Sequence, residues 1–176
     1  MAQTGSPARQ RGRILTISSL SLAAAIASAV LVAVDQRLAG FVAALGSGVG
    51  LLLSGVKVAG SGDAKLRFAD SLAERAVDAV ILGTVAWVAF PENTGVAAAA
   101  LAALVTSYLA SYLRARAVGL GFRVEEPFLL RPARMALVAL GVLEATALGA
   151  LWVATAISLQ AIIVRASAVA RQKESR

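Results

Sequence analysis

The sequence predicts an all-α protein, a polytopic membrane protein with six transmembrane helices. Of its 176 residues 59% are hydrophobic, and its mean hydropathy of +0.78 lies far above that of an ordinary soluble domain. Several uncharged runs reach the roughly 20 residues that a helix needs to cross a bilayer. Basic residues collect on alternate sides of these runs, which is the pattern of an inner-membrane protein. These observations predict a transmembrane domain over residues 14–169 and leave no room for a large soluble domain.

The first two spans follow a basic, polar segment. Residues 1–13 contain two glycines and a proline, so we expect a non-helical cytoplasmic lead-in there. The first span is predicted over residues 14–34 and the second over residues 38–58. Gly46 and Gly50 form a GxxxG pattern in the second span, which is typical of helices that pack closely in lipid.

Four further spans complete the predicted domain. Polar residues 59–68 connect the second span to the third, and residues 114–133 form the longest polar loop. Gly149 is the only turn signal in the last long apolar stretch, so we place the break between the last two spans there; the alternative is one long kinked pair without a proper loop. The four spans are predicted over residues 69–90, 96–113, 134–149 and 150–169, and residues 170–176 form a basic cytoplasmic tail.

The distribution of Lys and Arg predicts the orientation. With both termini in the cytoplasm, inner segments carry all of the 17 Lys and Arg residues except Arg37. Trp87, Phe90 and Trp152 then fall near the outer ends of their spans, as an aromatic belt would. The net charge of +7 is therefore explained by the basic cytoplasmic segments, which face membrane lipids. It does not indicate a nucleic-acid partner. Since the chain has no Cys and no His, it excludes Cys/His zinc sites and thiol or imidazole catalysis.

Three acids, Asp70, Glu74 and Asp78, recur every four residues where the third span is predicted to begin. Each four-residue step turns a helix by about 400°, so the three carboxylates share one face. Acidic groups near hydrocarbon are costly unless they are solvated, paired or bound to a cation. Two interpretations are open. One is a helix start, because Ser71 and Glu74 fit a capping box; the other is half of a divalent-cation and phosphate site.

Other charges lie in or beside the later spans. Glu144 lies midway along the predicted fifth span, where a lone carboxylate is a functional candidate; alternatively, this helix is short and Glu144 lies near its outer end. Arg165 lies inside the last span, from which its side chain could snorkel inward. Arginines also gather at both ends of the longest loop. They either bind phosphate, whose oxygens match the guanidinium fork, or act as topology determinants that face anionic lipid.

The order of these motifs resembles the CDP-alcohol phosphatidyltransferase family, especially its phosphatidylinositol-phosphate-synthase-like branch. The acids open the third span, residues 111–117 close the fourth, and residues 131–134 open the fifth. The resemblance covers roughly residues 38–169. It implies six membrane helices, a homodimer, and transfer of a phosphatidyl group from a CDP-linked lipid to an alcohol or alcohol phosphate, with release of CMP.

The resemblance also implies roles for single residues. The family signature is D-x2-D-G-x2-A-R-x8-G-x3-D-x3-D. Asp70 corresponds to its third Asp, Glu74 stands at the fourth as the catalytic base, and Asp78 matches an acid one turn later. In an active enzyme these three acids would hold Mg²⁺ or Mn²⁺. The residues implied to bind phosphate are Arg116, Arg131, Arg134 and, in place of the signature arginine, Lys57.

The sequence departs from this signature in its first half. Val49 and Leu52 stand at the first two Asp positions, and no acid occurs between Arg37 and Asp63. Because metal-assisted transfer needs carboxylates to hold the cations, we expect a catalytically degenerate homologue that acts as a partner, regulator or lipid-head-group binder. It would form a homodimer or a dimer with an active relative. The alternatives are an active transferase with a rebuilt metal site and an unrelated small transporter or membrane subunit.

Overall fold

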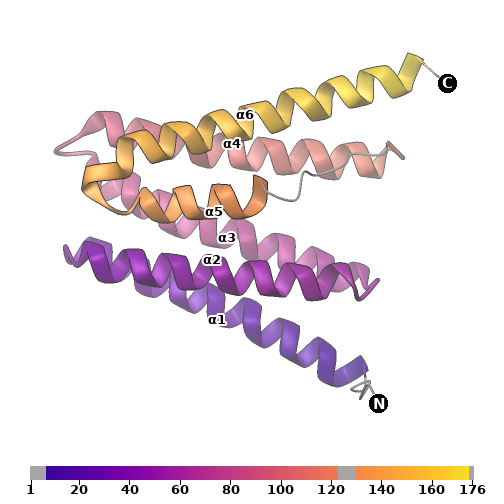
Figure 1. The fold of residues 1–176 in the computed structure, drawn as a ribbon, viewed down its shortest axis with the longest axis horizontal. Coiled ribbons are helices and arrows are strands. Elements are labelled where there is room, and N and C mark those ends of the chain that lie inside the picture. The colour runs from indigo at the N-terminus through magenta and orange to yellow at the C-terminus, as the bar shows by residue number, and fades with distance from the viewer. Residues whose placement is uncertain (1–6, 123–129, 175–176) are drawn as a thin grey trace.

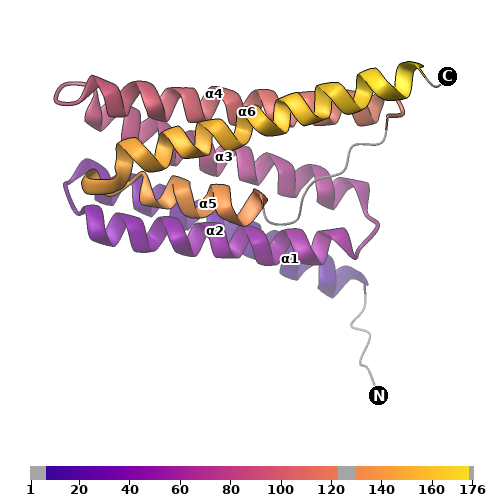
Figure 2. The same ribbon diagram turned by 45° about the horizontal axis from the view of Figure 1, so that its top comes forward.

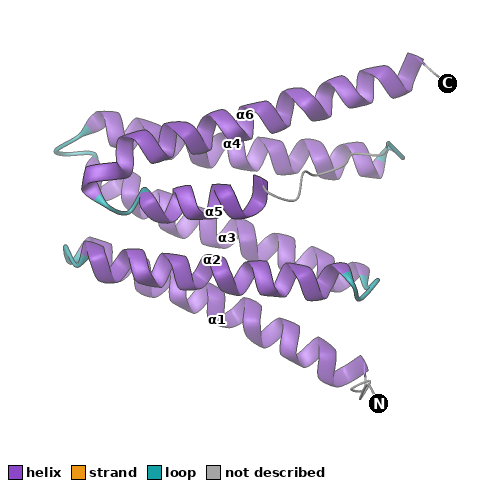
Figure 3. Cartoon of the chain, in the orientation of Figure 1, coloured by secondary structure: helices purple, strands orange, loops and turns teal. Residues whose placement is uncertain are grey.

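Six α-helices form an elongated bundle in the computed structural model, which describes residues 7–122 and 130–174 (Figures 1 and 3). The prediction of an all-α protein is confirmed. The helices are α1 (Pro7–Ala33), α2 (Arg37–Ala59), α3 (Ala64–Ala89), α4 (Thr94–Gly119), α5 (Leu130–Leu140) and α6 (Glu144–Glu174).

Four of the helices in the described parts of the chain are long and apolar enough to cross a membrane, which confirms a membrane protein. They are α1, α2, α4 and α6. α3 has 26 residues, as many as α4, but Glu74, Arg75 and Asp78 lie within its apolar part. α5 has 11 residues and spans only about 16 Å, roughly half of the hydrocarbon core. The predicted count of six spans is therefore not established by length and composition.

The break between the last two helices lies at residues 141–143, and its prediction at Gly149 is wrong. Leu151 packs so closely on Gly141 that a Cβ there would lie 2.9 Å from Leu151 Cγ. α6 continues through Gly149, where no neighbouring helix packs closely enough to lie within 4 Å of a Cβ. The predicted boundary failed because a contact distant in sequence, and not a local turn signal, sets the break.

Both ends of the chain are more helical than the sequence predicts. α1 begins at Pro7, because a proline is favourable in the first turn of a helix, where its missing N–H is not needed. The non-helical lead-in over residues 1–13 is therefore wrong from Pro7 onward, and residues 1–6 lie outside the described residues. α6 likewise extends through the predicted basic tail as far as Glu174.

α3 begins several residues before the acidic repeat. Its N-cap is Asp63, whose side chain accepts a hydrogen bond from the backbone N–H of Lys65 at 2.9 Å. The helix starts at Ala64, so Ser71 and Glu74 lie well inside it. The capping-box interpretation is therefore wrong, and the acids need another means of compensation.

α1 and α2 form an antiparallel pair held together by small residues. Ser47 donates a hydrogen bond to the carbonyl of Ser21 at 2.7 Å, and a Cβ on Gly50 would collide with the Ser21 hydroxyl. Gly46, by contrast, faces open space. Only the second glycine of the predicted GxxxG pattern therefore packs closely against a neighbouring helix in the described chain.

α3 is the central helix, in contact with α1, α2, α4 and α5 (Figures 1 and 2). α5 packs between α2 and α6, and α6 packs along α4. The start of α1, the end of α6 and the α2–α3 connection lie at one end of the bundle, which we call the basic end (Figure 1). α3 and α5 both run away from this end, so their sequences can be matched in parallel (Figure 1).

Candidate functional site

The three acids of α3 share one face of the helix, as their spacing predicts. Asp70 and Asp78 are buried, with 6% and 4% of their surface exposed, and Glu74 is half-buried. Neighbouring acids share the same guanidinium partners, which only side chains on one face can do. The predicted common face of the three carboxylates is confirmed, and the structure shows that this face points into the bundle.

Two arginines of α5 bind this row of acids. Arg131 Nη2 lies 3.1 Å from Asp70 Oδ2 and 3.3 Å from Glu74 Oε2. Arg134 lies 2.5 Å from Glu74 Oε1 through Nη2 and 2.7 Å from Asp78 Oδ2 through Nη1. Since α3 and α5 run in the same direction, each arginine bridges two successive acids. Arg131 and Arg134 therefore lie beside the acids, but as their counter-ions.

A third arginine and a serine close the network. Arg75 lies 2.8 Å from Glu74 Oε1 and 3.2 Å from Asp78 Oδ2, and it donates to the Ser107 hydroxyl at 2.6 Å. Ser107, on α4, donates to Asp78 Oδ2 at 2.8 Å and accepts a bond from Arg134. Sequence reasoning missed both residues. Arg75 could have been found from its place inside the acidic repeat, whereas nothing in the sequence singles out Ser107.

The arginine–carboxylate cluster, defined as Asp70, Glu74, Arg75, Asp78, Ser107, Arg131 and Arg134, is balanced in charge. Its three carboxylates face three guanidinium groups, which removes the large penalty of burying an unpaired charge. Asp70 is held least firmly, because its one ion pair among the described residues is with Arg131. Among the described side chains, its Oδ1 and the Nε atoms of Arg75 and Arg131 are buried without a hydrogen-bond partner.

α2 makes room for the cluster and adds no charged ligand to it. A Cβ on Gly55 would collide with the guanidinium of Arg131. Further along α2, Gly48 and Leu51 line a small hollow that reaches Asp78. Val49, which the resemblance places at the first signature Asp, is 54% exposed. The side of α2 that faces Asp78 thus presents residues that cannot ligate a cation.

As arranged, the acids do not fit a divalent cation. The guanidinium groups lie 2.5–3.3 Å from the oxygens of Asp70, Glu74 and Asp78 that a metal ion would have to share. Mg²⁺ and Mn²⁺ bind carboxylate oxygens that carry uncompensated negative charge. A metal could enter only if the arginines withdrew, which would break most of the cluster.

The other two predicted phosphate-binding residues lie elsewhere. Arg116 is exposed in the last turn of α4, and Lys57 is exposed in the last turn of α2, where it faces α1. Within the described residues, no contact joins either side chain to the arginine–carboxylate cluster. The set implied by the resemblance is therefore split between the buried cluster and two surface positions.

Two charges inside the predicted spans also differ from expectation. Glu144 is exposed as the first residue of α6, where the helix dipole favours a negative charge. Its placement at mid-span is wrong. The fifth helix is short, as the alternative expected, but Glu144 lies beyond its end, at the start of α6. Arg165 is 7% exposed and donates to the carbonyl of Ala110 at 2.5 Å, so it joins α6 to α4 and does not snorkel.

Comparison of the sequence with protein-family models and with curated proteins gives no match. The family that the motifs resemble is therefore an expectation, and the function has to be argued from the chemistry of the cluster and of the surface around it.

Proposed function

We propose that this chain is a catalytically inactive membrane protein with the architecture of CDP-alcohol phosphatidyltransferases, and that it binds anionic lipid head groups without transforming them. The observation that carries the proposal is the charge balance of the arginine–carboxylate cluster. The acids that would hold catalytic cations are paired with arginines from α3 and α5.

The chemical argument concerns the leaving group. Transfer from a CDP-linked lipid needs cations that neutralise the charge developing on CMP, and carboxylates have to hold those cations. Here the carboxylates accept bonds from guanidinium groups, and the facing residues of α2, Gly48 and Leu51, offer no further ligand. A structural role for Asp70, Glu74 and Asp78 fits this arrangement, because they join α3 to α5.

Head-group binding is the role that the surface supports. The basic end of the bundle carries Arg13, Lys57 and Arg116 as exposed side chains. Basic residues beside an anionic membrane surface contribute about 1 kcal/mol each to lipid attraction. We place this end at the cytoplasmic face of the inner membrane, with both termini inside, because nearly all Lys and Arg residues belong to the inner segments.

An activity assay tests the proposal directly. The purified chain in lipid nanodiscs is given a CDP-linked diacylglycerol with inositol phosphate or glycerol phosphate, in Mg²⁺ or in Mn²⁺. We expect CMP release no faster than in empty nanodiscs, while an active transferase in the same assay shows that the substrates are competent. Divalent-dependent turnover that is lost in Asp70→Asn and in Glu74→Gln would overturn the proposal and establish the active enzyme.

A further inference from the structure

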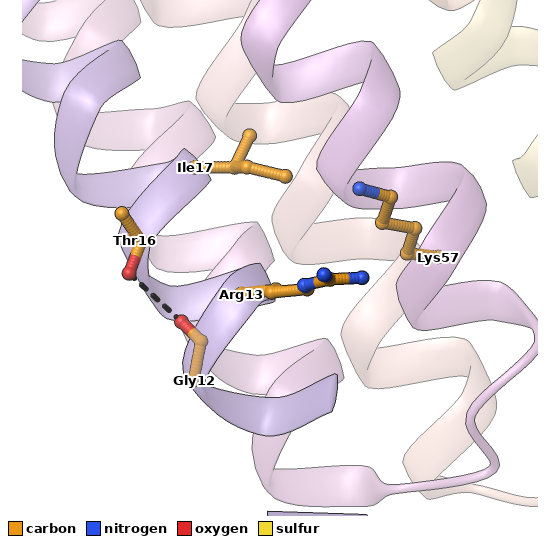
Figure 4. Close-up of a pocket in the computed structure, with 5 residues that line it drawn as sticks. All are labelled: Gly12, Arg13, Thr16, Ile17 and Lys57. Atoms are coloured by element: carbon orange, nitrogen blue, oxygen red, sulfur yellow. Dashed lines mark hydrogen bonds between the residues drawn. The ribbon is translucent and has the colours of Figure 1, made fainter. Parts of the chain in front are cut away.

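We propose that the phosphate of an anionic phospholipid binds in the hollow between α1 and α2, where Arg13 and Lys57 hold it. This inference rests on the proposed head-group binding and assigns it to one place. The hollow lies at the basic end, on the side of α2 that faces α1, and none of the residues that line it belongs to the arginine–carboxylate cluster (Figure 4).

The hollow has a volume of about 520 Å³ and is lined by Gly12, Arg13, Thr16, Ile17 and Lys57. Arg13 comes from the second turn of α1 and Lys57 from the last turn of α2, and both extend into the space between the two helices (Figure 4). The hollow is open beside Gly12, where nothing lies within 4 Å of the place that a Cβ would occupy. Two cations from different helices thus reach one open space.

The charge of these two side chains is not compensated. The neighbouring Arg11 pairs with Asp63 at 2.5 Å, whereas no carboxylate pairs with Arg13 or Lys57 in residues 11–122 and 130–172. Partial burial raises the pKa of Asp63, but hydrogen bonds from Arg11 and from the Lys65 amide outweigh it, and the pKa is lowered overall. Asp63 therefore stays ionised and committed to Arg11 at neutral pH.

The chemistry of the two cations suits a phosphodiester. The guanidinium of Arg13 offers a planar fork of donors to two phosphate oxygens, and the Lys57 ammonium adds a mobile point charge. Together they carry two positive charges, enough to neutralise the single negative charge of a phosphodiester.

The walls below the cations favour a lipid over a free phosphate. Ile17 lines the hollow, and an exposed leucine lies one turn further from the basic end on each helix. Leu20 follows Ile17 by one turn on α1 and is 64% exposed. Leu53 precedes Lys57 by one turn on α2 and is 54% exposed. Acyl chains can therefore lie along α1 and α2 while the phosphate stays between the cations.

The experiment measures which lipid collects beside this hollow. The full chain is reconstituted in nanodiscs of phosphatidylcholine that contain increasing fractions of phosphatidylglycerol. Because the chain has no native cysteine, Ser19→Cys, one turn from Thr16 on α1, carries a single fluorophore. Its quenching by labelled phosphatidylglycerol is compared with its quenching by labelled phosphatidylcholine.

We expect phosphatidylglycerol to be enriched at the reporter. The double variant Arg13→Gln/Lys57→Gln should weaken this preference by about tenfold or more, as the loss of two interfacial cations predicts. Lys65→Gln/Arg67→Gln is the matched control, since it removes two exposed charges at the same end of the bundle from the start of α3. The control should keep the preference close to that of the natural chain.

The other outcomes separate the two proposals. An equal loss in both double variants would show diffuse attraction and overturn the site in the hollow. A preference that survives Arg13→Gln/Lys57→Gln would also overturn the site, although head-group binding itself would stand. No preference for phosphatidylglycerol in the natural chain would overturn head-group binding. Complete displacement of the lipid by inorganic phosphate would show a phosphate site that does not need the lipid.

Discussion

The two groups of basic side chains in this bundle differ in burial and in charge balance. Arg131 and Arg134 are 26% and 11% exposed and pair with the acids of α3. Arg13 and Lys57 are exposed, come from α1 and α2, and face each other across an open hollow. In this bundle, Arg131 and Arg134 therefore join helices because carboxylates meet them, whereas the charges of Arg13 and Lys57 are the ones that the proposed lipid site uses.

The difference between the two groups also shows that residue type alone does not identify a phosphate site in this bundle. Arg134 has the chemistry of a phosphate ligand, but its donors are bound to Glu74, Asp78 and Ser107. The ammonium of Lys57 cannot form the two parallel hydrogen bonds that a guanidinium offers to phosphate, but it lines an open hollow that a ligand can enter. The two regions therefore differ in whether their donors are already bonded, and this depends on which side chains the neighbouring helices present.

The largest expected effect is an all-or-none difference in labelling, which tests whether the basic end, and with it the hollow of Arg13 and Lys57, lies at the cytoplasmic face. Lys65→Cys lies at the start of α3 and Glu92→Cys just beyond its end, about 40 Å apart along the helix. In intact cells, an impermeant thiol reagent should label Glu92→Cys and should label Lys65→Cys only after permeabilisation. The reverse result would place the hollow at the outer face and would contradict the proposal that it binds lipid at the cytoplasmic face.

Loss of an arginine should have very different effects on stability in the two regions. Arg134→Met removes one of the two guanidinium groups that Glu74 and Asp78 share and leaves the buried cluster with an excess negative charge, so we expect the free energy of unfolding to fall by about 3 kcal/mol. Arg13→Met removes an exposed, unpaired charge and should change it by less than about 0.5 kcal/mol. Reversible unfolding in mixed detergent micelles measures both. Equal effects would contradict the distinction between the regions.

The smallest expected effect comes from two glycines of α2. A methyl group at Gly55 displaces the Arg131 guanidinium from Asp70, and we expect Gly55→Ala to lower the free energy of unfolding by about 1 kcal/mol. Gly46→Ala is the control, because its methyl group enters open space and alanine favours the helix. A stable Gly55→Ala variant would show that Arg131 contributes little to the cluster.

The sequence predicted much of the secondary structure and part of the site. α2 was expected over residues 38–58 and extends over Arg37–Ala59, because one apolar run with polar flanks defines a helix without help from its neighbours. The common face of the α3 acids also followed from their spacing. The α5–α6 break did not, because Leu151 packing on Gly141 depends on two helices meeting.

The sequence by itself thus determined that the chain is a helical membrane protein, that three carboxylates form a row, and that basic residues gather at one end. These properties follow from hydropathy and helical periodicity, which act over a few residues. Only the tertiary structure decided that α5 brings Arg131 and Arg134 to the acids, that Ser107 of α4 completes their bonding, and that Lys57 faces Arg13. These partners are distant in the chain, so they become neighbours only when helices pack, and the packing fixes which charges are neutralised and which can bind a ligand.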